Sequence, residues 1–294
     1  MAGMADNTTP RPRRIALPAR GGDIAALEFG PQDRPIDVVF SHANGFNALT
    51  YRAILAPVAE GLRILAYDLR GHGATDLPTQ DEGRTDWSDM GEDLTALLQT
   101  LDLKDVVLAG HSMGGATSIL AANHAPERVR ALALFEPVIL PRVRKTGGAP
   151  GSGPTTEATL RRRNSFESRE QAVAAFVGRG AFTTWPRPMV EDYVAAGLKP
   201  LPGGGFTLAC TPAWEASGYR AHGNEVWPIL DRLTTPIRIL KGDIWSTTWV
   251  DEERRALEAT GRVRIETIAG ASHFLPMEHP DRVAQVLGEL AGVQ

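Results

Sequence analysis

One stretch decides the fold: Val106-Val107-Leu108-Ala109-Gly110-His111-Ser112-Met113-Gly114-Gly115 joins a short apolar run to a segment of helical character. A serine at such a sharp strand-to-helix turn exposes its hydroxyl at the edge of the sheet, and small neighbours are needed because strand and helix come close together. Gly110 and Gly114 meet that need. The first N–H groups of the helix can also stabilise negative charge on a substrate oxygen. Ser112 is therefore the candidate nucleophile, and a purely structural glycine-rich turn is the alternative.

The composition is that of an ordinary globular protein: 294 residues, 43% of them hydrophobic and 22% charged. The formal charge of −4 and the pI of about 6.0 favour neither nucleic acid nor an anionic membrane as a partner. A single cysteine, Cys210, excludes an internal disulfide and a cysteine-rich metal site. We expect a cytoplasmic protein that takes a small-molecule substrate, with a homodimer left open.

The first residues, 1–14, are polar and contain proline, and they lack the apolar centre of a secretory signal. We expect them to form a loose tail. No stretch of the chain reaches the length needed to span a bilayer.

Short apolar runs alternate with helical ones, a pattern that predicts parallel strands joined by helical crossovers. The expected class is α/β, with a mostly parallel central sheet flanked by helices. Residues 15–136 and 233–294 form this core. The expected strands are 24–29, 36–40, 63–67, 105–109, 129–135, 236–240 and 262–268, and the expected helices are 49–60, 87–101, 117–124, 251–259 and 280–290.

Residues 137–232 interrupt the alternation with proline and glycine clusters and short helical pieces at 169–177 and 188–196. They predict a mainly helical cap, inserted after the strand that ends at Glu136. Long surface loops are the alternative, although loops of this total length are uncommon in compact domains. The run 147–154 is typical of a mobile glycine-rich loop.

A serine hydroxyl needs a base within hydrogen-bond reach, and histidine has the appropriate pKa. His273 stands in Gly270-Ala271-Ser272-His273-Phe274, between the last expected strand and the last expected helix. The carboxyl ends of parallel strands share one edge of the sheet, so this loop reaches the edge that holds Ser112. His273 is the candidate base.

With these residues in place, the chain resembles the α/β-hydrolases, Ser112 and His273 standing at the family's nucleophile and base positions. Ser41-His42-Ala43-Asn44-Gly45-Phe46 resembles the family's His-Gly-X turn, and Tyr67-Asp68-Leu69-Arg70-Gly71-His72-Gly73 resembles its Asp-X-Arg-Gly-X-Gly turn. The resemblance implies an oxyanion hole made by the backbone N–H groups of Asn44 and Met113. Ala43 departs from the family, which usually has glycine there.

The acid of the triad is ambiguous in this sequence. Most of the family carries it three residues beyond a glycine, but three residues after Gly242 stands Trp245, which cannot do this work. Asp243 is the nearest carboxylate. A minority carries the acid at the end of the strand that follows the nucleophile helix, where this chain has Glu136. We favour Glu136, since a carboxylate at the tip of an apolar strand needs a partner and an imidazole N–H supplies one. Asp243 remains the alternative, and Glu136 would then pair with an arginine among residues 161–163.

The expected reaction is attack on an ester-type carbonyl, collapse to an acyl-enzyme, and hydrolysis by water activated by His273. This describes a carboxylesterase or lactonase for small or medium substrates, without metal or organic cofactor. Carbon–carbon bond hydrolases and cofactor-free perhydrolases use the same triad and stay open, as does a non-catalytic receptor. Candidate pocket residues are His42, Phe46, His111, Trp185, Trp214, Trp245 and Phe274.

Overall fold

The computed structural model describes residues 8–142, 154–221 and 226–292. Its centre is an eight-stranded sheet with the order β1-β2-β4-β3-β5-β6-β10-β11. The pairs β1–β2 and β2–β4 are antiparallel, and all other neighbours in this sheet are parallel. The strands are β1 (Arg11–Leu17), β2 (Gly22–Phe29), β3 (Val38–Ser41), β4 (Ile64–Tyr67), β5 (Val106–His111), β6 (Val129–Phe135), β10 (Ile237–Gly242) and β11 (Val263–Ile268).

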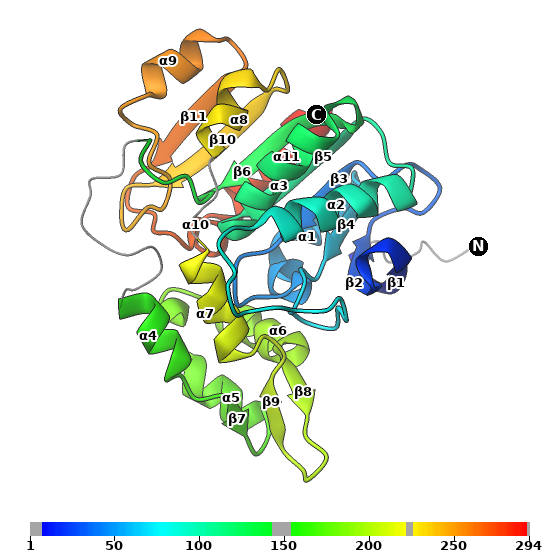
Figure 1. The fold of residues 1–294 in the computed structure, drawn as a ribbon, viewed down its shortest axis with the longest axis vertical. Coiled ribbons are helices and arrows are strands. Elements are labelled where there is room, and N and C mark those ends of the chain that lie inside the picture. The colour runs from blue at the N-terminus through cyan, green and yellow to red at the C-terminus, as the bar shows by residue number, and fades with distance from the viewer. Residues whose placement is uncertain (1–7, 143–153, 222–225, 293–294) are drawn as a thin grey trace.

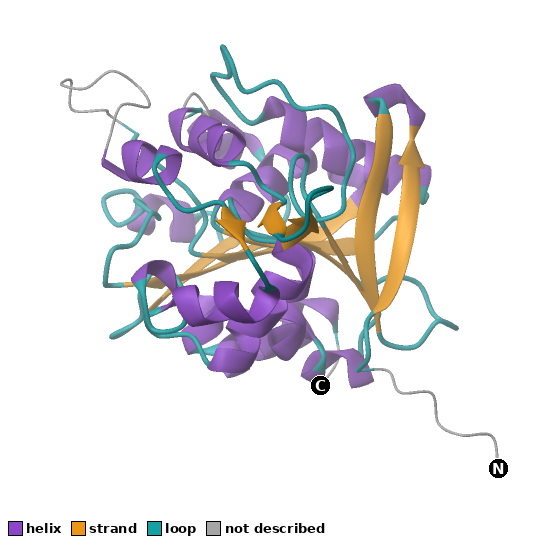
Figure 2. Ribbon diagram, turned by 90° about the horizontal axis from the view of Figure 1, so that it is seen from below, coloured by secondary structure: helices purple, strands orange, loops and turns teal. Residues whose placement is uncertain are grey.

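Helices cover both faces of the sheet (Figure 2). One apolar cluster joins the sheet to α2 (Ser88–Thr100), α3 (Met113–His124) and α8 (Val226–Arg232). The other joins it to α1 (Arg52–Leu55) and α11 (Pro280–Ala291). The central strands are buried on both sides, which explains their nearly continuous apolar sequences. Two short helices, α9 (Arg254–Ala259) and α10 (Leu275–Glu278), lie on either side of β11 in the chain. The α/β class expected from the alternation is confirmed.

The N-terminal segment differs from the expected tail. Residues 11–14 belong to strand β1, whereas residues 1–7 lie outside the described part of the chain. The strand is held by Arg13, whose guanidinium lies 2.6 Å from the buried carboxylate of Glu28 on β2. Being an edge strand, β1 exposes alternate side chains to water. Its polar, proline-bearing sequence therefore concealed it.

The helix expected over residues 49–60 is broken into three short pieces. A 3-10 turn over Ala48–Tyr51 leads into α1, and a second one covers Pro57–Glu60. Pro57 has no N–H to continue an α-helical ladder, and its ring clashes with the carbonyl of the preceding turn. The apolar side chains of this segment are buried in the same cluster as those of α11.

Residues 154–221, which we call the insertion, lie at one end of the core (Figure 1). They contain a small antiparallel sheet of order β7-β9-β8, which the sequence did not predict because its strands have only two or three residues. Residues 147–153 of the expected mobile loop lie outside the described residues. The elements are α4 (Pro154–Leu160), β7 (Ser165–Phe166), α5 (Arg169–Phe176), α6 (Arg187–Gly197), β8 (Leu198–Pro200), β9 (Phe206–Leu208) and α7 (Pro212–Arg220).

The expected cap boundaries, 137–232, were too wide. Helix α8 packs on α3, and its Trp227 and Leu230 join the apolar cluster of the core. At the other end, Val138 donates its backbone N–H to the carbonyl of Ser112, and Ile139 pairs with Thr248. Both ends of the segment therefore remain with the sheet, because their apolar side chains complete the core.

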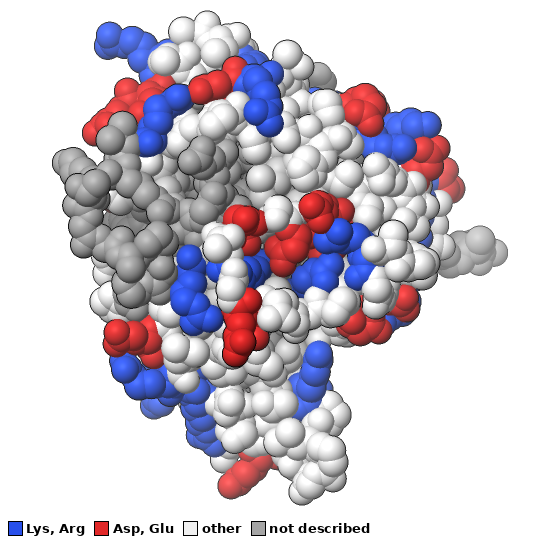
Figure 3. Space-filling view, viewed as in Figure 1, with Lys and Arg blue, Asp and Glu red and all other residues white. Residues whose placement is uncertain are grey.

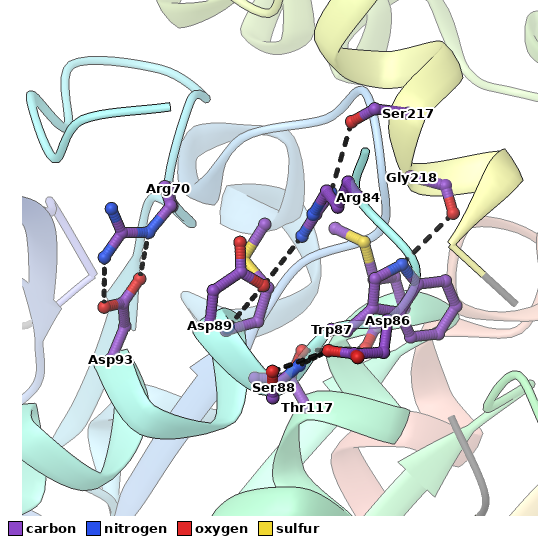
Figure 4. Close-up of polar contacts among 12 residues, drawn as sticks. Arg70, Arg84, Asp86, Trp87, Ser88, Asp89, Asp93, Thr117, Ser217 and Gly218 are labelled. Carbon is purple, nitrogen blue, oxygen red and sulfur yellow. Dashed lines mark hydrogen bonds and ion pairs between the residues drawn. The ribbon is translucent and has the colours of Figure 1, made fainter. Parts of the chain in front are cut away.

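Helix α7 of the insertion is fixed to the core by polar contacts (Figure 4). Arg84 donates to the Ser217 hydroxyl at 3.4 Å, and the indole N–H of Trp87 donates to the Gly218 carbonyl at 3.1 Å. The indole N–H of Trp214 reaches the Arg70 carbonyl at 2.9 Å. These contacts hold α7 beside the turn that follows β4.

On the face seen in Figure 3, basic and acidic side chains lie close to one another, without a broad area of one sign. Within the described ranges, no helix is both long and apolar enough to cross a membrane.

Candidate active site

Ser112 stands at a strained turn between β5 and α3. Its backbone angles, φ 57° and ψ −121°, lie in a region that L-residues rarely occupy. A Cβ atom at Gly110 would come within 2.3 Å of the Gly114 carbonyl oxygen, and one at Gly114 within 2.1 Å of the Ser41 carbonyl oxygen. Only glycine fits at either position, as a nucleophile elbow requires.

His273 meets the serine from the loop between β11 and α10. Its Nε2 lies 2.9 Å from the Ser112 hydroxyl oxygen. The contact joins two residues that are far apart in the chain and both stand at the carboxyl edge of the sheet. The imidazole is thus within reach of the hydroxyl proton.

Glu136 supplies the carboxylate on the other side of the imidazole. Its Oε2 lies 3.3 Å from His273 Nδ1, and its side chain is fully buried. The residue follows β6 directly and has a positive φ of 46°. Asp243 points elsewhere and accepts the Gly270 N–H at 2.8 Å. Of the two carboxylates weighed from the sequence, the structure brings Glu136 to the imidazole.

Three donors hold the Glu136 carboxylate in place. Oε1 accepts the Gly242 N–H at 2.6 Å and the Ser246 hydroxyl at 2.8 Å, and Oε2 accepts the Thr247 N–H at 3.0 Å. These donors are neutral, so the buried carboxylate is solvated by dipoles instead of by a cation. They come from the turn after β10, where most of the family carries its acid. The turn thus supports a carboxylate that another strand provides.

Thr247 also touches the base, a contact that sequence reasoning missed. Its hydroxyl lies 3.2 Å from His273 Nδ1 and donates to the Glu136 backbone carbonyl at 3.2 Å. The Nδ1–H therefore faces two acceptors, the Thr247 hydroxyl and the Glu136 carboxylate. This arrangement assigns the proton to Nδ1 and leaves Nε2 free to accept from Ser112. The signal in the sequence was the run of three hydroxyl residues, Ser246-Thr247-Thr248, just after Trp245.

The backbone N–H groups of Asn44 and Met113 have no acceptor among the described residues. Met113 follows Ser112 directly, and the turn that carries Asn44 approaches the same elbow, since a Cβ at Gly114 would lie 2.6 Å from the His42 carbonyl oxygen. Ala43 is tolerated in place of the family's usual glycine since its φ is not positive. Two unpaired donors at this edge are what a developing oxyanion needs.

A chain of hydrogen bonds joins the Asn44 turn to the base. The Ala43 N–H donates to the Tyr51 hydroxyl at 3.1 Å, and that hydroxyl donates to His111 Nδ1 at 2.7 Å. His111 Nε2–H donates to the His273 carbonyl at 2.7 Å. Burial lowers the pKa of His111 well below its usual range, and the nearby His273 acts in the same direction. A neutral imidazole is the form that can accept and donate in this chain.

Three of the expected pocket residues lie elsewhere. His42 is buried, its Nε2 accepting the Leu69 N–H and its Nδ1–H facing the Ala43 carbonyl. Trp214 is buried against the Arg70 turn. Trp245 is 84% exposed and has a positive φ of 51°. His111 likewise serves the scaffold. Histidines and tryptophans were natural pocket candidates, but His42 and Trp214 form hydrogen bonds with buried backbone groups instead.

The remaining three pocket candidates form an aromatic cluster beside the base. The Trp185 ring centroid lies 5.1 Å from that of Phe46 and 5.9 Å from that of Phe274. Phe274 in turn lies 5.6 Å from the His273 ring. Phe182 and Tyr193 of the insertion also pack on Trp185, and the Tyr193 ring lies 5.9 Å from that of Phe46. The insertion therefore contributes apolar surface next to the triad.

The insertion also places a buried ion pair against the Asn44 turn. Arg162 contacts the Glu215 carboxylate at 2.5 Å and the Tyr193 hydroxyl at 3.2 Å. A Cβ at Gly45 would lie 2.6 Å from Glu215 Oε1, and the Asn44 side chain donates to the Glu215 carbonyl at 2.9 Å. Burial raises the pKa of Glu215, and the Arg162 guanidinium acts in the opposite direction.

The comparison with known proteins agrees with this geometry. Residues 38–286 match the Alpha/beta hydrolase family. This chain belongs to that family. The match spans every element that carries the candidate triad, from β3 to α11.

The chain is also similar to hydrolases of known activity. The 2-(acetamidomethylene)succinate hydrolase of Mesorhizobium japonicum is 26% identical over 250 residues, which cover 83% of this chain and 84% of that protein. The 3-oxoadipate enol-lactonase 2 of Acinetobacter baylyi is 27% identical over 259 residues, 86% of each chain. A crystal structure of E-2-(acetamidomethylene)succinate hydrolase superposes with a TM-score of 0.77 at 20% identity, over 97% of this chain and 100% of that one. Membership in this α/β-hydrolase family supports hydrolytic activity.

Proposed function

We propose that the protein is a serine hydrolase that cleaves small or medium carboxylic esters or lactones through an acyl-enzyme on Ser112. The observation that carries this proposal is the continuous contact from the Ser112 hydroxyl through the His273 imidazole to the Glu136 carboxylate. A strained serine, a base and an orienting acid are the parts that acyl transfer needs.

The reaction begins when His273 Nε2 takes the Ser112 proton as the hydroxyl attacks the carbonyl carbon. The backbone N–H groups of Asn44 and Met113 stabilise the oxyanion of the tetrahedral intermediate. The imidazolium then gives its proton to the leaving oxygen, and the acyl-enzyme forms. Water, deprotonated by the same Nε2, attacks the ester and releases the acid. Glu136 and Thr247 keep the Nδ1 proton in place throughout.

The insertion acts as a cap in this proposal. Its Trp185 packs on Phe274 next to the His273 ring, and its Tyr193 packs on Phe46 of the Asn44 turn. In this proposal they bound the space for the acyl or alcohol group. Aromatic walls suit small or medium apolar groups.

A panel of p-nitrophenyl esters and simple lactones tests the function. Lactones are included because a relative with 27% identity is an enol-lactonase. The wild-type protein is expected to hydrolyse at least one substrate class, and Ser112→Ala to lower kcat by about 10³-fold or more. Equal activity of the two proteins, or none in either with Ser112 unmodified by a fluorophosphonate, would contradict the proposal.

A further inference from the structure

One buried tryptophan differs from the others. The indole N–H groups of Trp87, Trp214 and Trp227 donate to the carbonyls of Gly218, Arg70 and Leu140 at 3.1, 2.9 and 2.7 Å. Trp185 is equally buried, with 5% of its surface exposed, and its Nε1 has no partner among the described residues. Buried indole N–H groups usually find an acceptor, so this orphan donor calls for an explanation.

Trp185 lies close to the candidate triad, because its neighbour Phe274 packs on the His273 ring. It comes from the insertion, just before α6, and its ring packs on Phe46 and Phe274. Phe46 follows Asn44 by two positions, and Phe274 follows His273 directly. One aromatic ring thus separates Trp185 from the base on one side and from the oxyanion turn on the other. The other buried tryptophans with satisfied N–H groups pack in the cluster on the opposite face of the sheet.

We propose that the Trp185 N–H is a substrate-binding donor, which has no acceptor among the described residues because it donates to a second oxygen of the substrate. This inference rests on the proposed esterase or lactonase function and adds to it a substrate class. The substrate carries a keto, ester or carboxylate oxygen several bonds from the scissile carbonyl. An all-hydrocarbon acyl chain would leave a buried donor unpaired, and sites built to hydrogen-bond a group discriminate against analogues that lack it.

The phenyl rings around Trp185 sharpen the inference. Phe46, Phe182 and Phe274 offer no oxygen or nitrogen acceptor, so the acceptor must come from outside this cluster. The nearest competing explanation is that a ring face accepts the N–H weakly. If a ring face accepted the N–H, kcat/KM would not depend on a second oxygen in the substrate. An experiment can therefore distinguish a ring acceptor from a substrate acceptor.

The test compares matched p-nitrophenyl esters with and without the second oxygen. The pairs are 4-oxopentanoate with pentanoate and 5-oxohexanoate with hexanoate, and the monoesters of glutarate and adipate form a carboxylate arm. We define the oxygen preference as the ratio of kcat/KM within a pair. The wild-type protein is expected to show a preference of about fivefold to tenfold for at least one pair, the size of one hydrogen bond.

The decisive variant is Trp185→Phe, which keeps an aromatic ring and removes the N–H. It is expected to abolish the oxygen preference, because kcat/KM for the oxo or carboxylate ester falls about fivefold to tenfold further than kcat/KM for the matched alkyl ester. Trp227→Phe is the matched control, since it also removes a buried indole N–H, and it is expected to lower stability with the preference unchanged. If Trp185→Phe folds poorly, benzothienylalanine at position 185 replaces only N–H by sulfur and keeps the bicyclic shape.

Two results would overturn the inference: no oxygen preference in the wild-type protein, or a preference that survives removal of the N–H. Absence of hydrolysis of every ester, with no fluorophosphonate adduct on Ser112, would instead refute the proposed function and this inference with it. Preference for the oxo or the carboxylate arm tells which oxygen the site takes.

Discussion

Two buried glutamates, Glu136 in the core and Glu215 in the insertion, are stabilised in opposite ways. Glu136 at the end of β6 is held by backbone N–H groups, a hydroxyl and the His273 ring. Glu215 on α7 is paired with the guanidinium of Arg162. A carboxylate among neutral donors can stabilise a cation that appears transiently on an imidazole. A carboxylate that is paired with a permanent cation is already neutralised and cannot stabilise a second one. We therefore assign a catalytic role to Glu136 and a structural role to Glu215.

The largest expected effect is the loss of catalytic rate when Glu136 is changed. Glu136→Gln is expected to lower kcat by about 10³- to 10⁴-fold, because an amide N–H₂ facing Nδ1 favours the wrong imidazole tautomer. Asp243→Asn is the matched control and is expected to stay within about twofold of the wild type, since Asp243 bonds only to the Gly270 turn. Steady-state ester hydrolysis measures both, with thermal unfolding as a check of folding. The reverse ranking of the two variants would remove Glu136 from the triad.

The second effect is a loss of stability when Glu215 is changed. Glu215→Gln leaves the Arg162 guanidinium without its counter-charge in a mostly buried position, which typically costs about 3–5 kcal/mol. We expect a loss in the free energy of unfolding of roughly that size, measured by urea titration. Glu136→Gln is expected to lose much less stability in the same assay, because no fixed cation is left unpaired. Equal losses for the two variants would show that the glutamates are not divided in this way.

The turn that carries Asn44 and Gly45 gives a pH-dependent effect. His72 accepts the Gly45 N–H at its Nε2, and burial lowers the pKa of His72 to about 4. The folded state therefore binds fewer protons than the unfolded state, so this contribution is complete above pH 6.5 and is lost as the pH falls towards 4. The loss reaches about 3 kcal/mol over that range.

Urea titrations of the wild type and His72→Asn at several pH values between 4.5 and 7.5 measure this contribution. The free energy of unfolding of the variant is expected to fall less steeply with decreasing pH. The difference in slope corresponds to at most one proton taken up on unfolding. Asp68, whose pKa burial raises to about 6, acts in the opposite sense in both proteins and cancels in the difference. Parallel curves would mean that His72 is not titrated on unfolding.

The smallest effect is a modest loss of catalytic rate when one donor to the Glu136 carboxylate is removed. Ser246→Ala removes one of the donors on Glu136 Oε1 and leaves the Gly242 N–H in place. We expect kcat to fall about threefold to tenfold with KM unchanged, since one of several hydrogen bonds to the carboxylate is lost. Stopped assays at saturating ester measure it. An unchanged kcat would show that the turn after β10 does not support the acid.

The sequence predicted the parts of this site that follow from chain order along a parallel sheet. Ser112 and His273 each directly follow, or lie shortly after, an apolar strand, so their meeting at one edge needed no knowledge of packing. Glu136 was favoured by the same reasoning. Contacts that depend on a turn's shape, such as the Thr247 hydroxyl on Nδ1, could not be predicted, because spacing says nothing of where a side chain points.

Polar edge elements and aromatic residues were the other source of error. Strand β1 has three arginines among its first four residues, and Glu28, which pairs with two of them, lies on the neighbouring strand. Trp214 and Trp245 were grouped with Trp185 as pocket residues because all three carry large amphipathic rings. Their separation into a buried anchor, an exposed residue and an orphan donor depends on tertiary contacts.

The most direct test of the account is covalent labelling by a fluorophosphonate probe, with the adduct located by peptide mass spectrometry. We predict one adduct on Ser112 in the wild-type protein and none in Ser112→Ala. In Glu136→Gln we predict labelling at least about 10²-fold slower, because the imidazole of His273 is held in the wrong tautomer to act as a base. An unlabelled wild type, an adduct on another residue, or equal rates for the wild type and Glu136→Gln would contradict the claim that Ser112, His273 and Glu136 act as one catalytic unit.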